Sequence, residues 1–385
     1  MTSWTTASAS RRSFLKISAA AGGALLLGGG LSACGGGDKS ASGSGGAKIG
    51  TSLEEITQLA KQEGRVQLIA YPETWANYKG HFKAFTAKYG VKIDVANPDG
   101  SSAQELQAVK TLKGQKTQPD VLDIGYSFTQ PAIQQGLLEK YKPTNFDSVP
   151  EALKDADGWW VGAYYGVLTI GVNPAAVDNV PKTFADLLKP EYKGKVMLPG
   201  DPRQGASSNA SVVAAAISRG GGPGNIQPGI DYFAALKKSG NLVSATSVAS
   251  ALTTGEAAVA FDWNYNFVGI TDELAKSKVK LQQVVPSDGV FGVYYAQPLT
   301  VSSPQPNAGR LWIDWLTSDE GSEQYALGGA VPARLSVVKD KLSKKALDTL
   351  PDPAVLEKIV FPTIDQGNAD AKVLVEQWGP KVVNQ

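Results

Sequence analysis

The sequence predicts an α/β protein with two lobes, each a mostly parallel sheet flanked by helices, joined by two extended crossing segments. Short apolar strands alternate with amphipathic helices along most of the chain, as in a parallel sheet that is covered on both faces. Two long runs rich in aromatic and β-branched residues, 159–173 and 289–302, interrupt this alternation. We expect both runs to cross between the lobes and to leave a cleft with a hinge.

The first lobe is expected to begin with a short amphipathic helix, after which strands alternate with helices. Ser52 and Glu55 have the spacing of a capping box, and Gly90 follows the second helix as a C-cap. Tyr78 and Phe85 recur on one face of that second helix. The predicted strands are 65–71, 91–96 and 120–124, and the helices after the first are 75–89 and 101–112.

The second lobe repeats the alternation, and the chain then returns to the first lobe. The predicted strands are 195–198, 241–245 and 257–262, and the predicted helices are 207–218, 230–238, 306–325 and a pair around 354–378. We therefore expect lobe 1 to comprise 51–162 and 296–335 and lobe 2 to comprise 163–295. Residues 336–385 are expected to form C-terminal helices that pack on the lobes.

The first 33 residues are typical of a twin-arginine export signal. The segment 10–16 reads SRRSFLK, an apolar stretch rich in Gly and Ala follows at 17–30, and LSAC at 31–34 is typical of a lipoprotein processing box. The apolar stretch is too short and too rich in glycine for a membrane-spanning helix. We expect export by the twin-arginine pathway, cleavage before Cys34, and a lipid on Cys34 that anchors the protein to the extracytoplasmic (periplasmic) face of the cell membrane. Residues 34–50 are expected to form a flexible Gly/Ser linker.

Charge and composition exclude several classes of protein. Of the 37 Lys and Arg residues, three lie in 1–33, so 34 remain against 36 Asp and Glu residues, and no bulk basic surface is left for nucleic acid. Hydrophobic residues make up 42% of the chain and charged residues 19%, which indicates a globular protein. We expect a monomer that binds a small solute and, through its lipid, a membrane, with no nucleic-acid partner.

A ligand site is expected at the carboxyl ends of the strands, because ligands of open parallel sheets bind there. The residues that follow the predicted strands are 73–78, 97–102, 123–128, 201–204 and 262–264. They include carboxylates and aromatic side chains, which together favour an ammonium group, since an aromatic face adds about 0.5–2 kcal/mol per cation contact. The alternative is that Asp123 and Asp262 only cap helices and that the tryptophans belong to the core.

Three stretches carry a resemblance to a known family. They are 166–199 (GVLTIGVNPAAVDNVPKTFADLLKPEYKGKVMLP), 255–264 (GEAAVAFDWN) and the turn 329–334 with its Pro332. Through them, residues 63–335 resemble the extracellular solute-binding lipoproteins (family 1) of ATP-driven, or ABC, importers, in the branch of polyamine and ferric-ion binders. The resemblance implies a type II periplasmic-binding-protein fold, binding of a small solute between two lobes, and its delivery to the permease subunits of the ABC transporter.

The resemblance also implies ligand-binding positions, because polyamine binders line the cleft with aromatic rings and meet the amines with acids. A Trp-x-x-Tyr motif follows the first strand at 75–78, and Trp263 matches the tryptophan of a Trp-Asn pair. The family places two acids where Asp201 and Gln204 stand, and an aromatic residue where Tyr294 stands. The predicted site for a polyamine-like or other cationic amine is Glu73, Trp75, Tyr78, Tyr126, Asp201, Gln204, Asp262, Trp263 and Tyr294.

Two other ligand classes fit parts of the sequence. Ser101 and Ser102 precede a helix whose N–H groups attract anions, and Arg203 is expected nearby, which favours a phosphonate or a phosphorylated organic solute. Ferric ion requires hard oxygen and imidazole donors, but the tyrosine pairs lie in the crossing segments, and His81, the only histidine, is expected on a helix surface. We expect no metal site and no cofactor.

An exported hydrolase is the rival class of function. The chain has no GxSxG motif and no Cys/His pair, and a single histidine on a helix surface does not suit a Ser-His-Asp triad. The S-x-x-K spacing at 277–280 and 336–339 occurs without the SDN motif of serine acyl-enzymes. We therefore expect that the protein is not an enzyme.

Overall fold

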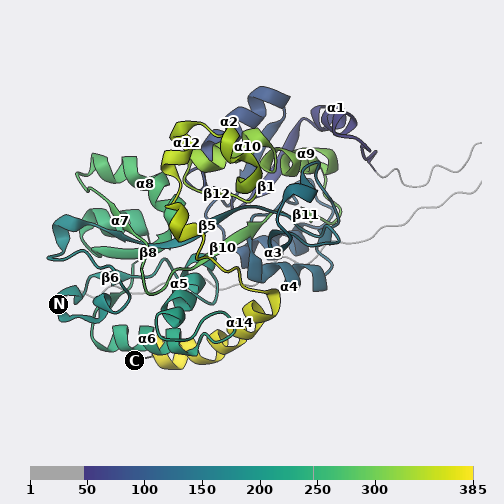
Figure 1. Ribbon diagram of the computed structural model, residues 1–385. Coiled ribbons are helices and arrows are strands. Elements are labelled where there is room, and N and C mark those ends of the chain that lie inside the picture. The colour runs from purple at the N-terminus through teal and green to yellow at the C-terminus, as the bar shows by residue number, and fades with distance from the viewer. Residues whose placement is uncertain (1–46, 246, 385) are drawn as a thin grey trace, which may run out of the picture. The chain divides into compact units, whose positions relative to one another are not determined.

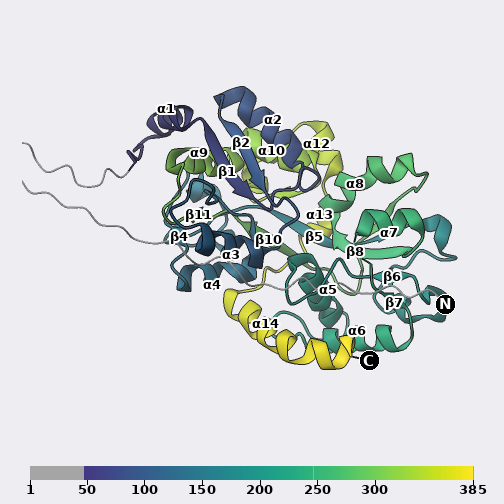
Figure 2. The same ribbon diagram turned by 180° about the vertical axis from the view of Figure 1, so that it is seen from behind.

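The structure is a computed structural model of the protein, and it describes residues 47–245 and 247–384. The predicted export signal at 1–33, Cys34 and most of the predicted linker lie outside these residues. Within the described ranges, no helix has both the length and the apolar composition needed to cross a membrane. Figure 1 shows the helices and strands, and Figure 2 shows them from behind.

Two extended segments join the two lobes, as the sequence predicts, and they pair with each other. Strands β5 (Gly162–Val172) and β10 (Gly292–Ala296) run antiparallel. The first half of β5 also pairs with β12 (Val331–Pro332), whereas its second half pairs with β8 (Val259–Trp263) and β9 (Gln282–Val284). One continuous strand therefore contributes to the sheet on both sides of the crossing.

The first lobe is built on a parallel pair of strands, β1 (Arg65–Ile69) and β2 (Lys92–Ala96). The predicted strand 120–124 is not continuous. Val121 forms isolated β-bridges, and Ile124 is the first residue of the short strand β3. The other elements of this part are α1 (Leu53–Glu63), α2 (Tyr78–Tyr89), α3 (Ser102–Leu112), β3 (Ile124–Gly125), α4 (Thr129–Gln134), β4 (Leu138–Glu139) and β11 (Leu299–Thr300).

Capping signals in the sequence set the helix ends of this lobe. The Ser52 hydroxyl accepts the backbone N–H of Glu55 at 3.2 Å and starts α1. Ser101 forms a complete capping box with Gln104 at the start of α3. Gly90 ends α2 in the left-handed region, with φ 72°, which a residue with a side chain rarely adopts. The predicted boundaries at these points are confirmed.

The second lobe places β8 beside β6 (Val196–Met197) and β6 beside β7 (Leu242–Val243), both parallel as predicted. Its helices are α5 (Ala206–Ile217), α6 (Gln227–Lys238), α7 (Val248–Thr254) and α8 (Asn264–Lys276). Helix α8 is not among the predicted elements, because it starts directly at the end of β8 with no side-chain cap to mark it.

The predicted helix 306–325 is two helices, α9 (Pro306–Leu316) and α10 (Asp319–Leu327). The break occurs because the Ser318 hydroxyl accepts the backbone N–H of Gly321 at 3.0 Å and starts a new helix. The remaining helices are α11 (Leu335–Val338), α12 (Lys344–Thr349), α13 (Pro353–Leu356) and α14 (Ile364–Trp378).

Helix α14 contacts both lobes. Gly367 lies so close to the ring of Tyr126, which follows β3, that a Cβ on this glycine would be 2.8 Å from the ring. Three residues further on, the Asp370 carboxylate accepts the backbone N–H of Gly224 at 2.9 Å, just before α6. Figures 1 and 2 show α14 running from the side of α4 toward α6, where the C-terminus lies. The C-terminal helix therefore forms a third link between the lobes, beside β5 and β10.

The prediction that His81 lies on the surface is wrong. His81 is fully buried, because α9 and α10 cover that face of α2, and its Nδ1 accepts the indole N–H of Trp315 at 3.2 Å. Burial lowers the pKa of His81 to about 3, so the imidazole is neutral. Lys79 and Lys83 flank it in sequence, but residues two positions apart on a helix do not share a face.

The cap at Ser318 gives a test of this arrangement. Because Ser318→Ala removes the acceptor for the Gly321 N–H, we expect it to lower the free energy of unfolding by about 1 kcal/mol. Ser318→Asp restores a capping oxygen and should recover most of that loss. Urea denaturation followed by circular dichroism measures both variants, and equal stability of Ser318→Ala and the unmodified protein would contradict the role of the cap.

Candidate functional site

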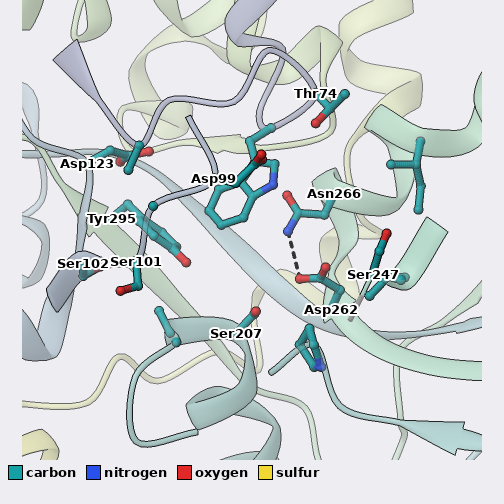
Figure 3. A pocket seen from close by; sticks show the side chains of 18 of the residues that line it. Thr74, Asp99, Ser101, Ser102, Asp123, Ser207, Ser247, Asp262, Asn266 and Tyr295 are labelled. Carbon is teal, nitrogen blue, oxygen red and sulfur yellow. Dashed lines mark hydrogen bonds between the residues drawn. The ribbon is translucent and has the colours of Figure 1, made fainter. Parts of the chain in front are cut away.

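A pocket of about 520 Å³ opens where the loops and helix starts of the two lobes meet (Figure 3). Its wall comes from the loops after β1 and β2, the first turns of α3, α5, α7 and α8, and the strand β10. Four carboxylic acids line it, Asp99, Glu105, Asp123 and Asp262, and no Lys, Arg or His is among its described lining residues. The site therefore offers acidic groups without a basic partner.

Trp75 reaches the pocket because the helix predicted at 75–89 begins three residues later, at Tyr78. The preceding Ala76 and Asn77 adopt left-handed backbone conformations, with φ 47° and 58°, which turn the chain before the helix starts. The half-buried Trp75 ring packs edge-to-face on Tyr295, with 6.2 Å between ring centroids. These two aromatic rings line the same pocket.

Asp262 and Asn266 form a polar pair at the end of β8 and in the first turn of α8. The Asp262 Oδ1 accepts the backbone N–H of Trp263 and the Nδ2–H of Asn266, both at 2.8 Å. Burial raises the pKa of Asp262 to about 6, so the carboxylate is charged at neutral pH. The amide oxygen of Asn266 is buried and has no hydrogen-bond partner in the described part of the chain. A carboxylate and an unpartnered amide oxygen thus come from two neighbouring side chains that line the pocket.

Asp123 and Glu105 are more deeply buried than Asp262. Asp123 Oδ2 accepts the hydroxyls of Tyr78 at 2.8 Å and Tyr164 at 2.9 Å, and its Oδ1 accepts the side-chain amide of Gln297. Glu105 accepts the backbone N–H of Asp123 at 2.8 Å. Burial raises the pKa of Asp123 to about 7 and that of Glu105 well above its ordinary value. Burial therefore favours the protonated form of Glu105, and groups of the protein itself already donate to both oxygens of Asp123.

Two helix starts from opposite lobes also face the pocket. At α3, Ser101 is the cap, and the Ser102 hydroxyl accepts the backbone N–H of Gly125 at 3.1 Å. At α5 the cap is Gly205, which has no side chain to accept the N–H groups of the first turn, and Ser207 lines the pocket there. Helix N-termini carry partial positive charge, so this part of the wall also suits an anion.

Of the predicted site residues, the structure brings Trp75 and Asp262 to this pocket, together with Ser101 and Ser102. Trp263 is fully buried behind the wall, and its indole N–H donates to the Tyr295 hydroxyl at 3.1 Å. Tyr78 is fully buried too, with its hydroxyl on Asp123. Both side chains support groups that line the pocket and are not themselves part of its surface.

Other predicted residues lie away from the pocket. Tyr294 stacks on Trp160, with 5.2 Å between centroids, and lies next to the buried Tyr126. Glu73 is exposed, with its carboxylate 3.7 Å from the ammonium of Lys79.

The predicted residues 201–204 form a separate group. Arg203 donates to both carboxylate oxygens of Asp201 and lowers the pKa of that acid. Arg203 and Gln204 line a separate cavity of about 50 Å³ beside α14. Arg203 thus pairs with Asp201 and does not line the pocket that Ser101 and Ser102 line.

Sequence reasoning did not identify Asn266, Tyr295 and Ser207 as site residues, although they line the pocket. A signal existed for two of them. Adjacent residues of a strand face opposite sides, so Tyr294 and Tyr295 could not both face the cleft. Asn266 stands four residues after Asp262, a separation that brings two side chains together when a helix follows the strand directly.

Comparisons with known proteins agree with this arrangement. The model of a family described as "Bacterial extracellular solute-binding protein" matches residues 116–358. The "Spermidine/putrescine-binding periplasmic protein 1" of Haemophilus influenzae is 25% identical over 320 residues, which are 77% of this chain and 83% of that relative.

Solved structures show the same fold. The periplasmic binding protein AfuA from Actinobacillus pleuropneumoniae, with fructose-6-phosphate bound, is 20% identical with a TM-score of 0.67, over 83% of this chain and 99% of that one. Iron-bound HitA from Pseudomonas aeruginosa is 21% identical with a TM-score of 0.63, over 82% and 99%. The fold is thus that of two-lobed periplasmic binding proteins. Because the family model matches more than half of the chain, the protein belongs to the bacterial extracellular solute-binding proteins, the solute receptors of ABC importers.

Proposed function

We propose that the solute is a cationic amine, polyamine-like or otherwise, bound in the pocket between the lobes. Solute-binding proteins of ABC importers bind small solutes and work with permease components, so the open question for this chain is the ligand. The composition of the pocket wall supports this proposal. The wall has acids, two aromatic rings and an unpartnered amide oxygen, but no basic side chain among its described residues.

The chemistry of such a wall suits an ammonium group. Removing a cation from water is costly unless carboxylates and hydrogen-bond acceptors replace its hydration shell. Asp262 supplies the charge, and the Trp75 ring lines the same space, where a cation–π contact adds about 0.5–2 kcal/mol. The spermidine/putrescine-binding relative supports this choice of ligand class. In this proposal Trp75 and Asp262 contact the solute, while Trp263 holds Tyr295 in place.

Delivery requires the two lobes to close on the solute. We place lobe 1 at 51–162 and 296–335 and lobe 2 at 163–295, with the hinge in β5 and β10, and closure as a hinge motion about these strands. The closed form is then the one that the permease receives. The protein itself catalyses no reaction in this account.

We further propose that the protein is exported by the twin-arginine pathway and is held as a monomer at the extracytoplasmic face by a lipid on Cys34. The motif at 10–16 and the LSAC sequence at 31–34 support this proposal.

A change at Cys34 tests the anchor. Cys34→Ser removes the thiol that would carry the lipid, so the exported protein should move from the membrane fraction to the soluble extracytoplasmic fraction. Fractionation and immunoblotting of cells that express each form measure this, with Ser32→Ala as a control that leaves the cysteine in place. Retention of Cys34→Ser in the membrane would contradict the lipid anchor.

A phosphonate or phosphorylated solute is the second candidate, because two helix N-termini face the pocket and Ser101, Ser102 and Ser207 line it. Ferric ion remains a third ligand class, represented by the iron-bound HitA fold relative. Among the described residues, no group of three or more His, Cys, Asp or Glu side chains is placed to hold a metal ion.

A thermal-shift panel separates these ligand classes. A ligand that binds only the folded protein at about 100 times its Kd adds roughly 2.7 kcal/mol of stability. We expect putrescine or spermidine to raise the melting temperature, and fructose 6-phosphate, aminoethylphosphonate and ferric citrate to leave it unchanged. A shift with the phosphorylated compounds alone would contradict the amine proposal and move the site to Ser101, Ser102 and the start of α5.

Amine affinity should also depend on pH through Asp262. Burial raises the pKa of this acid to about 6, so the carboxylate that faces the ammonium is lost as the pH falls through that value. The affinity for putrescine should be highest above pH 7 and should fall below pH 6 by up to about tenfold per unit, and Asp123, which lines the same pocket with a pKa raised to about 7, adds to the fall. Titration calorimetry measures the affinity, and Asp262→Asn should bind more weakly with a flatter profile. An unchanged profile in Asp262→Asn would assign the titration to another group.

A further inference from the structure

We infer that the pocket selects ammonium groups that carry N–H bonds over quaternary ammonium groups, and that Asn266 makes this selection. The inference rests on the proposed function, since it assumes that the solute is an amine. The inference is based on one atom, the amide oxygen of Asn266. The Asn266 side chain is only 5% exposed, it lines the pocket, and its amide oxygen has no hydrogen-bond partner within residues 47–245 and 247–384.

The orientation of this amide is fixed by its neighbour. The Asn266 Nδ2 donates to Asp262 Oδ1 at 2.8 Å, and the opposite orientation would place the amide oxygen against a carboxylate oxygen. Figure 3 shows the amide nitrogen of Asn266 facing Asp262 and its oxygen turned away from that carboxylate. The unpartnered atom is therefore an acceptor that can only be satisfied by a donor from elsewhere.

A buried acceptor without a partner indicates a ligand donor at this place. Buried polar atoms in folded proteins are nearly always hydrogen-bonded, because leaving one unpaired forfeits its interaction with water. Leu or Met at position 266 would fill the same helical position without that cost, and both are better helix formers than Asn. A solute N–H group that reaches this oxygen when it enters the pocket would repay the cost.

Two acceptors on one side of the pocket match the donors of an amine. A primary ammonium has three N–H donors, so it can donate to Asn266 Oδ1 and to the Asp262 carboxylate together. A quaternary ammonium has the same charge and the same attraction to the Trp75 ring, but it has no N–H bond to donate. A bound quaternary ammonium would leave the Asn266 amide oxygen without a donor and would also displace water from that oxygen. Charge and aromatic contact therefore cannot separate the two kinds of cation here, whereas Asn266 can.

The test compares two cations of the same charge and chain length by titration calorimetry at pH 7.5: n-butylammonium, which has three N–H donors, and butyltrimethylammonium, which has three methyl groups in their place. We expect the unmodified protein to prefer the primary amine by at least about 100-fold, because a site built for a hydrogen bond rejects the analogue that lacks it. Asn266→Leu, which has a similar size and no amide, should reduce this preference by about tenfold or more, mainly through weaker binding of the primary amine.

Two further variants distinguish selection from other roles. Asn266→Gln retains an amide that has both an N–H donor for Asp262 and an acceptor oxygen, so it should keep the preference for the primary amine even if Asn266→Leu proves unstable. Asp262→Asn removes the charge that both cations share, so it should weaken both ligands and change the preference less than Asn266→Leu does. Melting temperatures of all variants show whether each one is folded.

The possible outcomes separate this inference from the proposed function. If Asn266→Leu weakens both cations equally, Asn266 only holds Asp262 and the inference is wrong. If the unmodified protein binds the quaternary cation as tightly as the primary amine, the selection itself is wrong while the amine proposal stands. If neither cation binds and phosphorylated solutes do, the proposed function fails and the inference fails with it.

Discussion

The antiparallel pairing of β5 with β10 connects the two lobes and places Tyr295 at the pocket. The first half of β5 pairs with β10 and β12, and its second half pairs with β8 and β9. The crossing is narrow because it contains glycine. A Cβ on Gly166 would lie 2.5 Å from the Tyr265 ring, and one on Gly292 would lie 2.7 Å from the Gly166 carbonyl oxygen. Side chains at either position would push the two crossing strands and the aromatic layer apart.

The crossing strands also carry the buried layer behind the pocket. Tyr164 of β5 stacks between Tyr295, at 5.6 Å, and Tyr325, at 4.6 Å, and its hydroxyl donates to Asp123. Asp123 in turn accepts from Tyr78, which comes from α2. Hydrogen bonds and stacked rings therefore tie the floor of the pocket to the hinge. The atoms that face the solute are thus held by neighbours that are buried and already paired, which limits how far they can adapt to a different ligand.

Much of this architecture could be predicted from the sequence, because local signals determine it. The alternation of strands and helices, the caps at Ser52 and Ser101, and the two crossing runs all depend on residues close together in the chain. The sequence predicts Trp75 and Asp262 at the pocket because Trp75 follows a strand and Asp262 lies at the end of one.

The rest could not be predicted, because it depends on contacts between distant segments. Tyr295 faces the pocket and Tyr294 packs on Trp160 only because of the register of β10 on β5. His81 is buried because α9 and α10, more than 200 residues later in the chain, cover its helix. The pairing of Asp201 with Arg203 is local, and the sequence is compatible both with this pair and with a role of either residue in a ligand site.

A crystal structure of the protein grown with putrescine would show directly whether an amine binds between Asp262, Asn266 and the Trp75 ring. We expect an elongated ligand between the lobes, with one ammonium within hydrogen-bond distance of Asp262 and Asn266 and its chain against the Trp75 ring. An amine bound elsewhere on the molecule, or a pocket that remains free of amine at a concentration well above the Kd measured in solution, would contradict it.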